Sequence, residues 1–197
     1  MSKTDRPAVD RIMYCHGFAS SFDPQKDKVK ALSMLAPVQG VTVDYTSLPE
    51  KVFEAFEAEL QGPSRTLIIG TSMGGFFAAW LGGAFNRPFI AINPAVSPAI
   101  SLQKYLGQGQ THFGTPYDLK REVVRAYQDI PFQFDGPGEI VLDLGDEVID
   151  AWDTLAMVAN RLPITTFEGG SHRFDHMSEL LTILAEKFDF KAPSPEA

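Results

Sequence analysis

Short apolar runs alternate with amphipathic stretches along most of the chain. Six apolar runs have the length of strands and are bounded by turn-forming residues: 11–15, 41–45, 66–69, 89–92, 140–144 and 164–167. Apolar positions at helical spacing fill most of the intervals: 24–36, 50–60, 73–84, 150–160 and 176–188. Strands that alternate with helices indicate βαβ units, and strands that are apolar on both faces indicate a parallel sheet covered on both sides. We therefore expect an α/β fold, with one mostly parallel sheet of about six strands and helices on both faces.

One long segment departs from this alternation. Residues 95–138 are rich in Gly, Pro and Gln and only weakly periodic, so we expect a small excursion with short helices over one end of the sheet. The segment is too short to form a second domain. Polar residues 1–9 and a Pro-rich tail from about Asp189 flank the pattern. We expect a single domain over residues 1–197, folded from about 10 to 188.

Composition and charge narrow the classes of function. The chain has 17 basic and 25 acidic residues, a net charge of −8, and no basic run, which argues against a nucleic-acid partner. Its lone cysteine, Cys15, lies in an apolar run and permits neither an internal disulfide nor a site of several thiolates. No apolar run reaches the roughly 18 residues of a membrane span, and the polar N-terminal residues do not look like a signal peptide. We expect a cytoplasmic protein.

A serine between two glycines is the most informative motif. Gly70-Thr71-Ser72-Met73-Gly74 fits G-x-S-x-G and lies where an expected strand gives way to an expected helix. A nucleophilic serine projects from a sharp strand-to-helix turn, where larger side chains two residues away would collide with the backbone. The positive end of the following helix also points to the place where an oxyanion forms. We expect Ser72 to be a catalytic nucleophile and not merely a turn residue.

Motifs for cofactors and metals do not fit the chain. The turn after the first strand, His-Gly-Phe-Ala-Ser-Ser at 16–21, lacks the glycine spacing of a dinucleotide-binding loop. No Gly-Lys-Ser/Thr end of a phosphate-binding loop is present. His172 and His176 have the spacing of a zinc pair, but Arg173 stands where the zinc motif has Glu. We expect neither a cofactor nor a metal.

His172 is the candidate general base among four histidines. It follows the last expected strand, 164–167, in a glycine-containing loop, which is where this fold type places its base. His176 is expected inside the final helix, facing solvent or packing against the helix. His16, at the end of the first strand, is expected to be buried, hydrogen-bonded and important for the shape of its loop. His112 lies in the excursion and has no special claim as a base.

Asp146 is the candidate acid that orients the base. It follows Gly145 in the turn after the penultimate strand, where the orienting carboxylate should lie. Asp143 continues the strand-like alternation and is expected to serve structure. Asp150 and Asp153 lie at the start of the next helix, where capping and the helix dipole explain them.

The order of these residues matches one hydrolase design. Ser72, Asp146 and His172 follow the Ser…Asp…His order of α/β-hydrolases, not the order of the chymotrypsin or subtilisin designs. An oxyanion hole needs two backbone donors. We expect the N–H of Met73, directly after the nucleophile, and the N–H of Phe18, in the loop after the first strand.

Five segments together resemble the YqiA/YcfP-like family of small bacterial α/β-hydrolase esterases. They are Tyr14-Cys15-His16-Gly17-Phe18, Gly70-Thr71-Ser72-Met73-Gly74-Gly75, Asn93-Pro94-Ala95-Val96, Gly145-Asp146-Glu147-Val148 and Glu168-Gly169-Gly170-Ser171-His172. The similarity runs from about residue 12 to 188. The resemblance implies a compact α/β-hydrolase fold with a minimal cap and a triad of Ser72, Asp146 and His172.

The sequence therefore predicts a serine hydrolase of the esterase or thioesterase type. Its partner would be a small-molecule acyl ester or thioester, cleaved through an acyl-enzyme intermediate. Four side chains of the excursion are candidates for substrate contact: Tyr105, His112, Phe113 and Tyr117. Two alternatives stay open: a non-catalytic binding protein on a hydrolase scaffold, and a peptidase or acyltransferase that uses the same triad. No oligomeric state is assigned.

Overall fold

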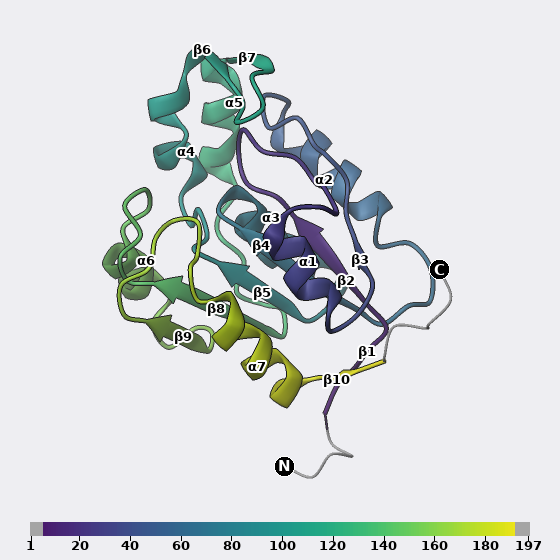
Figure 1. Ribbon diagram of the computed structural model, residues 1–197. Coiled ribbons are helices and arrows are strands. Elements are labelled where there is room, and N and C mark those ends of the chain that lie inside the picture. The colour runs from purple at the N-terminus through teal and green to yellow at the C-terminus, as the bar shows by residue number, and fades with distance from the viewer. Residues whose placement is uncertain (1–5, 192–197) are drawn as a thin grey trace.

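A six-stranded parallel sheet forms the centre of the computed structural model, which describes residues 6–191 (Figure 1). In spatial order the strands are β3 (Val38–Gln39), β2 (Arg11–Cys15), β4 (Thr66–Thr71), β5 (Phe89–Ile92), β8 (Gly138–Asp143) and β9 (Ile164–Phe167). Every neighbouring pair in this sheet is parallel. All carboxyl ends therefore meet at one edge, the place where open α/β sheets bind their ligands. The expected α/β class and the sheet of six strands are confirmed.

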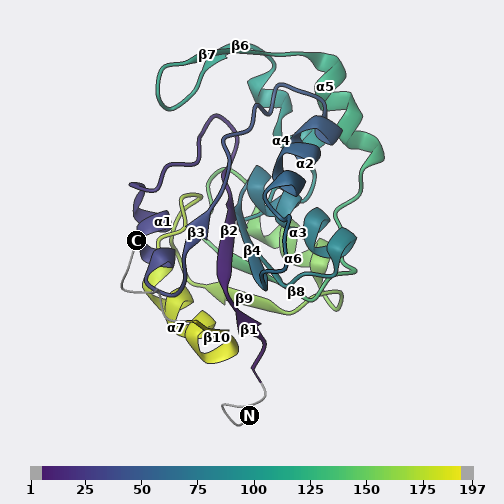
Figure 2. The same cartoon turned by 90° about the vertical axis from the view of Figure 1, so that its right-hand side faces the viewer.

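Helices cover both faces of the sheet, as expected (Figure 2). One face carries α1 (Asp27–Ser33) and α7 (Met177–Lys187), and the other carries α2 (Pro49–Ala58), α3 (Met73–Phe85) and α6 (Ala151–Val158). Alternate residues of each strand serve the two faces: Ile12 packs into the core beneath α1 and α7, and Met13 into the core beneath α2 and α3. Within residues 6–191, no helix combines the length and the apolar character needed to cross a bilayer.

The expected strand at residues 41–45 is wrong. The edge strand is β3, and residues 41–45 have no regular secondary structure. The backbone N–H of Val43 donates to Nε2 of His16 at 3.0 Å, and the Tyr45 hydroxyl donates to the backbone oxygen of His16. Val43 and Tyr45 are both buried. The alternation of apolar residues there reflects burial over the end of β2, not pairing within the sheet.

The excursion between β5 and β8 contains short helices and an unforeseen hairpin. Its elements are α4 (Pro98–Ser101), a 3₁₀ helix (Gln103–Tyr105), the antiparallel strands β6 (Gly107–Gln110) and β7 (Pro116–Leu119), α5 (Arg121–Ala126) and a second 3₁₀ helix (Tyr127–Asp129). The hairpin lies beyond the carboxyl ends of the sheet (Figure 1). Its turn contacts the loop after β2: the N–H of His112 donates to the oxygen of Ala19 at 2.9 Å, and Nζ of Lys26 lies 4.5 Å from the ring centre of Phe113.

Strands of the structure lie slightly beyond the expected limits of 10 and 188. Strand β1 (Ala8–Val9) pairs in parallel with β10 (Asp189–Phe190) at the amino ends of the main strands. Val9 is 1% exposed, and Asp10 pairs with both Arg65 and Lys191. Strands of two residues are too short to show a period of two, which explains why the pattern did not reveal them.

Candidate active site

Ser72 occupies a strained turn between β4 and α3. Its φ of 58° and ψ of −122° lie outside the ordinary regions for an L-residue. Backbone hydrogen bonds hold the turn: the Ser72 N–H donates to Ile92 oxygen at 3.0 Å, and the Ser72 oxygen accepts from the N–H groups of Ala95 at 3.0 Å, Gly75 at 2.9 Å and Phe76 at 3.3 Å. The neighbouring strand β5 and the segment after it therefore fix the backbone that presents Ser72.

The glycines of the motif permit this turn. A Cβ on Gly70 would lie 2.0 Å from the Gly74 oxygen, and a Cβ on Gly74 would lie 2.0 Å from the Cys15 oxygen. Both obstacles are backbone atoms, which cannot turn aside as a flexible side chain can. The structure agrees with the steric reason inferred from the sequence for glycine at these two positions.

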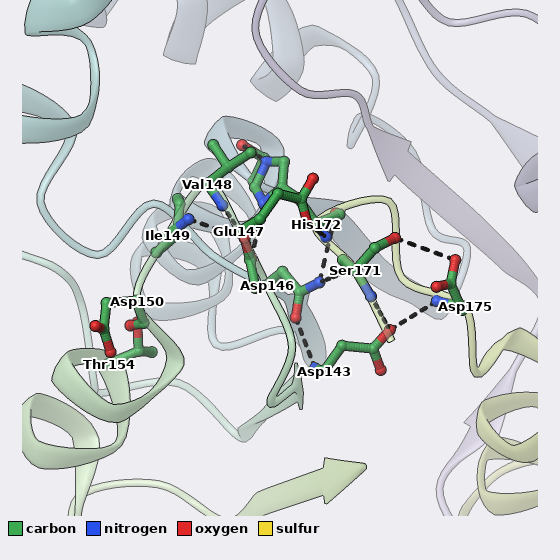
Figure 3. A network of polar contacts seen from close by, with 12 residues as sticks. Asp143, Asp146, Glu147, Val148, Ile149, Asp150, Thr154, Ser171, His172 and Asp175 are labelled. Atoms are coloured by element: carbon green, nitrogen blue, oxygen red, sulfur yellow. Dashed lines mark hydrogen bonds and ion pairs between the residues drawn. The ribbon is translucent and has the colours of Figure 1, made fainter. Parts of the chain in front are cut away.

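The three side chains proposed for the triad lie in hydrogen-bond contact. Nε2 of His172 is 3.0 Å from Oγ of Ser72, and Nδ1 of His172 is 2.8 Å from Oδ2 of Asp146. The Asp146 side chain is 1% exposed, and its Oδ1 accepts the N–H groups of Val148 and Ile149, both at 2.8 Å (Figure 3). A carboxylate in this position keeps a proton on Nδ1, which leaves Nε2 able to accept a proton from the serine hydroxyl.

Asn93 joins the His172 loop to the sheet, a contact that the sequence did not predict. Its side-chain nitrogen donates to the backbone oxygens of Ser171 at 3.0 Å and His172 at 3.4 Å, and its side-chain oxygen accepts from the N–H of Asp143 at 2.9 Å. Asn93 is 1% exposed and has a φ of 41°. On the other side of the loop, Glu147 accepts the N–H of His172 at 3.0 Å. The local signal for Asn93 was a polar residue directly after an apolar strand.

Asp143 supports the same loop from below, in agreement with the structural role expected for it (Figure 3). Its buried carboxylate accepts the N–H groups of Ser171 at 3.2 Å and Asp175 at 2.7 Å, and contacts Nδ1 of His176 at 2.7 Å. The hydrogen bond to Asp143 raises the pKa of His176. His176 precedes α7 instead of lying inside it, because its ring stacks on Phe167 with ring centres 4.8 Å apart.

His16 shapes the loop after β2, as expected. It is 1% exposed; its Nε2 accepts the N–H of Val43, so Nδ1 carries the proton and donates to the Gly17 oxygen at 2.8 Å. Burial lowers the pKa of His16 to about 4. The loop passes close to Ser72, since a Cβ on Gly17 would lie 3.3 Å from Cβ of Ser72. Cys15, next to it, is a buried free cysteine of the core, also as expected.

A cavity of about 200 Å³ opens beside Ser72. Its lining residues are Phe18, Ser72, Met73, Ser101, Leu102, Lys104, Tyr105, His112, Glu147, Val148, Ile149, His172 and Arg173. Both residues proposed for the oxyanion hole, Phe18 and Met73, are in this set. Of the four candidate substrate contacts, Tyr105 and His112 line the cavity and the other two do not.

The other two candidates for substrate contact, Phe113 and Tyr117, pack against protein side chains outside the cavity. Phe113 is 57% exposed at the turn of the hairpin, where it lies under Lys26. Tyr117 packs edge-on against Phe18 with ring centres 5.2 Å apart, so it supports the wall of the cavity from behind. Both positions result from the hairpin, whose register the sequence pattern did not reveal. Among the described residues, no cluster of three or more His, Cys, Asp or Glu side chains could hold a metal ion.

Comparison with protein families gives one match over most of the chain. The model described as "Uncharacterised protein family (UPF0227)" matches residues 11–188. A curated UPF0227 protein of Serratia proteamaculans (strain 568) is 24% identical over 174 residues, which cover 85% of this chain and 92% of that protein.

Solved structures show the same fold at low sequence identity. Est1E from Butyrivibrio proteoclasticus aligns with a TM-score of 0.70 at 18% identity, over 94% of this chain and 89% of its own. Alpha/beta hydrolase domain-containing protein 10 from mouse aligns with a TM-score of 0.69 at 13% identity, over 92% and 90% of the two chains. The esterase domain of a Rhodothermus marinus protein gives 0.61 at 15% identity, over 92% and 85%. The fold is that of the α/β-hydrolases.

Proposed function

The chain belongs to the UPF0227 family, the YqiA/YcfP-like family that its motifs resemble, and we propose that it is a serine hydrolase that cleaves carboxylic esters or thioesters. The observation that carries the proposal is the continuous contact from Asp146 through His172 to Ser72, with distances of 2.8 and 3.0 Å. One of the structural neighbours, the domain from Rhodothermus marinus, is an esterase domain, which supports this chemistry.

The proposed reaction begins with proton transfer from Ser72 to His172. Oγ of Ser72 attacks the carbonyl carbon, and the carbonyl oxygen becomes an oxyanion that accepts the backbone N–H groups of Met73 and Phe18. The proton on Nε2 of His172 then passes to the leaving alcohol or thiol as the acyl-enzyme forms. Water, deprotonated by His172, attacks the acyl-enzyme and releases the acid and the free serine. Asp146 stabilises the charged imidazole in both halves of the cycle.

Labelling with a fluorophosphonate probe tests the proposal. We expect stoichiometric labelling of the native protein at Ser72 and none in Ser72→Ala, because the probe reacts with an activated serine. Ser33→Ala, which removes an exposed hydroxyl on α1, is the matched control and should be labelled like the native protein. His172→Gln should lose at least 99% of the labelling rate, since His172 is the only side chain among residues 6–191 that hydrogen-bonds to Oγ of Ser72.

Absence of labelling in the native protein would favour the non-catalytic binding protein. A substrate series distinguishes the enzymatic alternatives: 4-nitrophenyl esters of graded acyl length, acyl thioesters and peptide amides. We expect Ser72-dependent release of acid from esters or thioesters and not from amides. Cleavage of amides alone would instead identify a peptidase.

A further inference from the structure

Two cationic side chains line the cavity that contains Ser72. Lys104 comes from the 3₁₀ helix of the excursion, and Arg173 directly follows His172 in the loop after β9. The two residues therefore approach the cavity from separate parts of the chain, and both are exposed to solvent. A ligand in the cavity can therefore contact the side chain of Lys104 or of Arg173.

Neither cation is neutralised by a carboxylate of the described residues. The other close pairs of the structure include Lys51 with Glu54 at 2.8 Å and Arg65 with Asp10 at 2.7 Å, but no carboxylate between residues 6 and 191 pairs with Lys104 or Arg173. Nζ of Lys104 donates to the backbone oxygen of Val148 at 3.3 Å. An ammonium group has three N–H donors, so this bond leaves donors free.

The nearby carboxylates are already engaged with the His172 loop. Asp146 is 1% exposed and is bonded to His172 and to two backbone N–H groups. Glu147 lines the cavity and accepts the N–H of His172, which lowers the pKa of Glu147 and keeps it ionised. The lining thus carries two cations against one carboxylate, in a chain whose net charge is −8. The lining residues alone therefore have a formal charge of +1, opposite in sign to that of the chain.

We infer that the substrate carries an anionic group, a carboxylate or a phosphate, that Lys104 and Arg173 bind while its acyl carbonyl lies at Ser72. This inference rests on the proposed function and specifies the class of its substrate. The apolar lining residues Leu102 and Ile149 suit a short hydrocarbon segment between the two groups. The anionic group can belong to the acyl part, as in a half-ester of a dicarboxylic acid, or to the leaving group, as in an acyl thioester of a phosphorylated thiol.

Matched esters that differ only in charge test the inference. The 4-nitrophenyl half-ester of glutaric acid carries a free carboxylate, and its methyl ester is the neutral counterpart. We expect kcat/KM to be at least tenfold higher for the charged ester at about 10 mM ionic strength and the preference to shrink at about 0.5 M, where salt screens the attraction. Short-chain acyl thioesters of phosphorylated and unphosphorylated thiols form the second arm, which shows whether the charge belongs to the leaving group.

Substitutions assign the preference to these two side chains. Lys104→Met and Arg173→Met should each lower the charged-to-neutral ratio of kcat/KM about tenfold, and Lys104→Arg should retain most of it. Lys30→Met and Arg125→Met make the same change of charge on exposed parts of α1 and α5, outside the cavity lining, and should leave the ratio unchanged.

Failure of this inference and failure of the proposed function give different results. Ser72-dependent hydrolysis without a charge preference in either arm, or with a ratio that Lys104→Met and Arg173→Met do not alter, overturns the inference and leaves the proposed function standing. If no ester or thioester is hydrolysed, the anionic site is tested by binding instead, through an NMR titration of Ser72→Ala with monomethyl and dimethyl glutarate. Tighter binding of the monoanion that Arg173→Met weakens supports the anionic site, and equal or absent binding overturns it.

Discussion

At the scale of single residues, the turn at Ser72 depends on the absence of two β-carbons. The nearest obstacle to a Cβ on Gly70 is a backbone oxygen at 2.0 Å, so the turn itself would have to shift. Gly83, near the C-terminal end of α3, is different because a Cβ there would have its nearest neighbour at 3.6 Å. A side chain is therefore excluded at Gly70 and tolerated at Gly83.

We expect Gly70→Ala to lower the free energy of unfolding by about 3 kcal/mol or more, as overpacking against backbone does. Gly83→Ala should raise it by roughly 0.5–1 kcal/mol, because alanine favours the helix. Urea unfolding of the two variants and the native protein measures both effects. Equal stability of the two variants would contradict the steric account.

Asn93→Gly should slow the reaction of Ser72 with a fluorophosphonate about 100-fold. Glycine accepts the φ of 41° but removes the hydrogen bonds to the His172 loop, and a displacement of about 1 Å can cost that much. Asn86→Gly, at a φ of 47° at the end of α3, is the control and should react normally. Measurement well below the thermal midpoint keeps both variants folded. A normal rate in Asn93→Gly would show that the loop holds its own position.

The difference between Asn93 and the proposed triad shows what the sequence could reveal. Ser72, Asp146 and His172 each lie in the turn or loop that follows a strand, a place that local pattern identifies, and the structure brings them into contact. Asn93 is bonded to Ser171, 78 residues further on, through a side chain that reaches from the end of β5 past β8 to the loop after β9. No local periodicity encodes such a contact.

At the scale of elements, the pattern identified the strands that lie inside the sheet better than those at its margins. Four buried strands overlap the expected ranges, because burial on both faces gives continuous apolar runs, and the partly exposed edge strand 164–167 also lies where it was expected. The prediction of a strand at 41–45 is wrong because the alternate residues Val43 and Tyr45 are buried near His16 without pairing to another strand. The hairpin β6–β7 was missed because its first strand, Gly-Gln-Gly-Gln, carries no apolar signal.

Buried His16 should make the fold sensitive to acid. Its pKa of about 4 in the folded protein lies below the 6.5 of an ordinary histidine, so the unfolded chain binds the proton first as pH falls. The free energy of unfolding should therefore drop between pH 6.5 and pH 4, with about 3 kcal/mol attributable to this group. Urea unfolding across this range measures the slope, which should be shallower in His16→Gln.

His176 supplies a control of opposite sign. The bond to Asp143 raises its pKa, so its contribution to stability is complete below pH 6.5 and is lost as pH rises through the higher value of the folded protein. His176→Gln should consequently keep the steep acid slope that His16→Gln loses. An unchanged slope in His16→Gln would show that other groups cause the acid sensitivity.

At the scale of the whole molecule, the two ends of the described chain are tied together by β1 and β10. Val9, 1% exposed, packs into the core that α1 and α7 cover. Val9→Ala should lower the free energy of unfolding by about 2 kcal/mol, from the loss of two buried methyl groups. Met34→Ala, at a residue 75% exposed, should change it little. Thermal unfolding measures both, and equal midpoints would mean that β1 is not part of the cooperative fold.

The segment that forms one wall of the cavity leaves the sheet after β5 and returns at its immediate neighbour, β8. Both junctions are short, and the sheet pairs these two strands directly. An exchange of residues 96–137 for the corresponding stretch of a relative would therefore replace five lining residues of the cavity and leave three partners of Ser72 in place: His172, Ile92 and Ala95. The buried residues of the segment, among them Tyr127 and Phe132, pack on Phe76 of α3, so an exchange must keep this core contact.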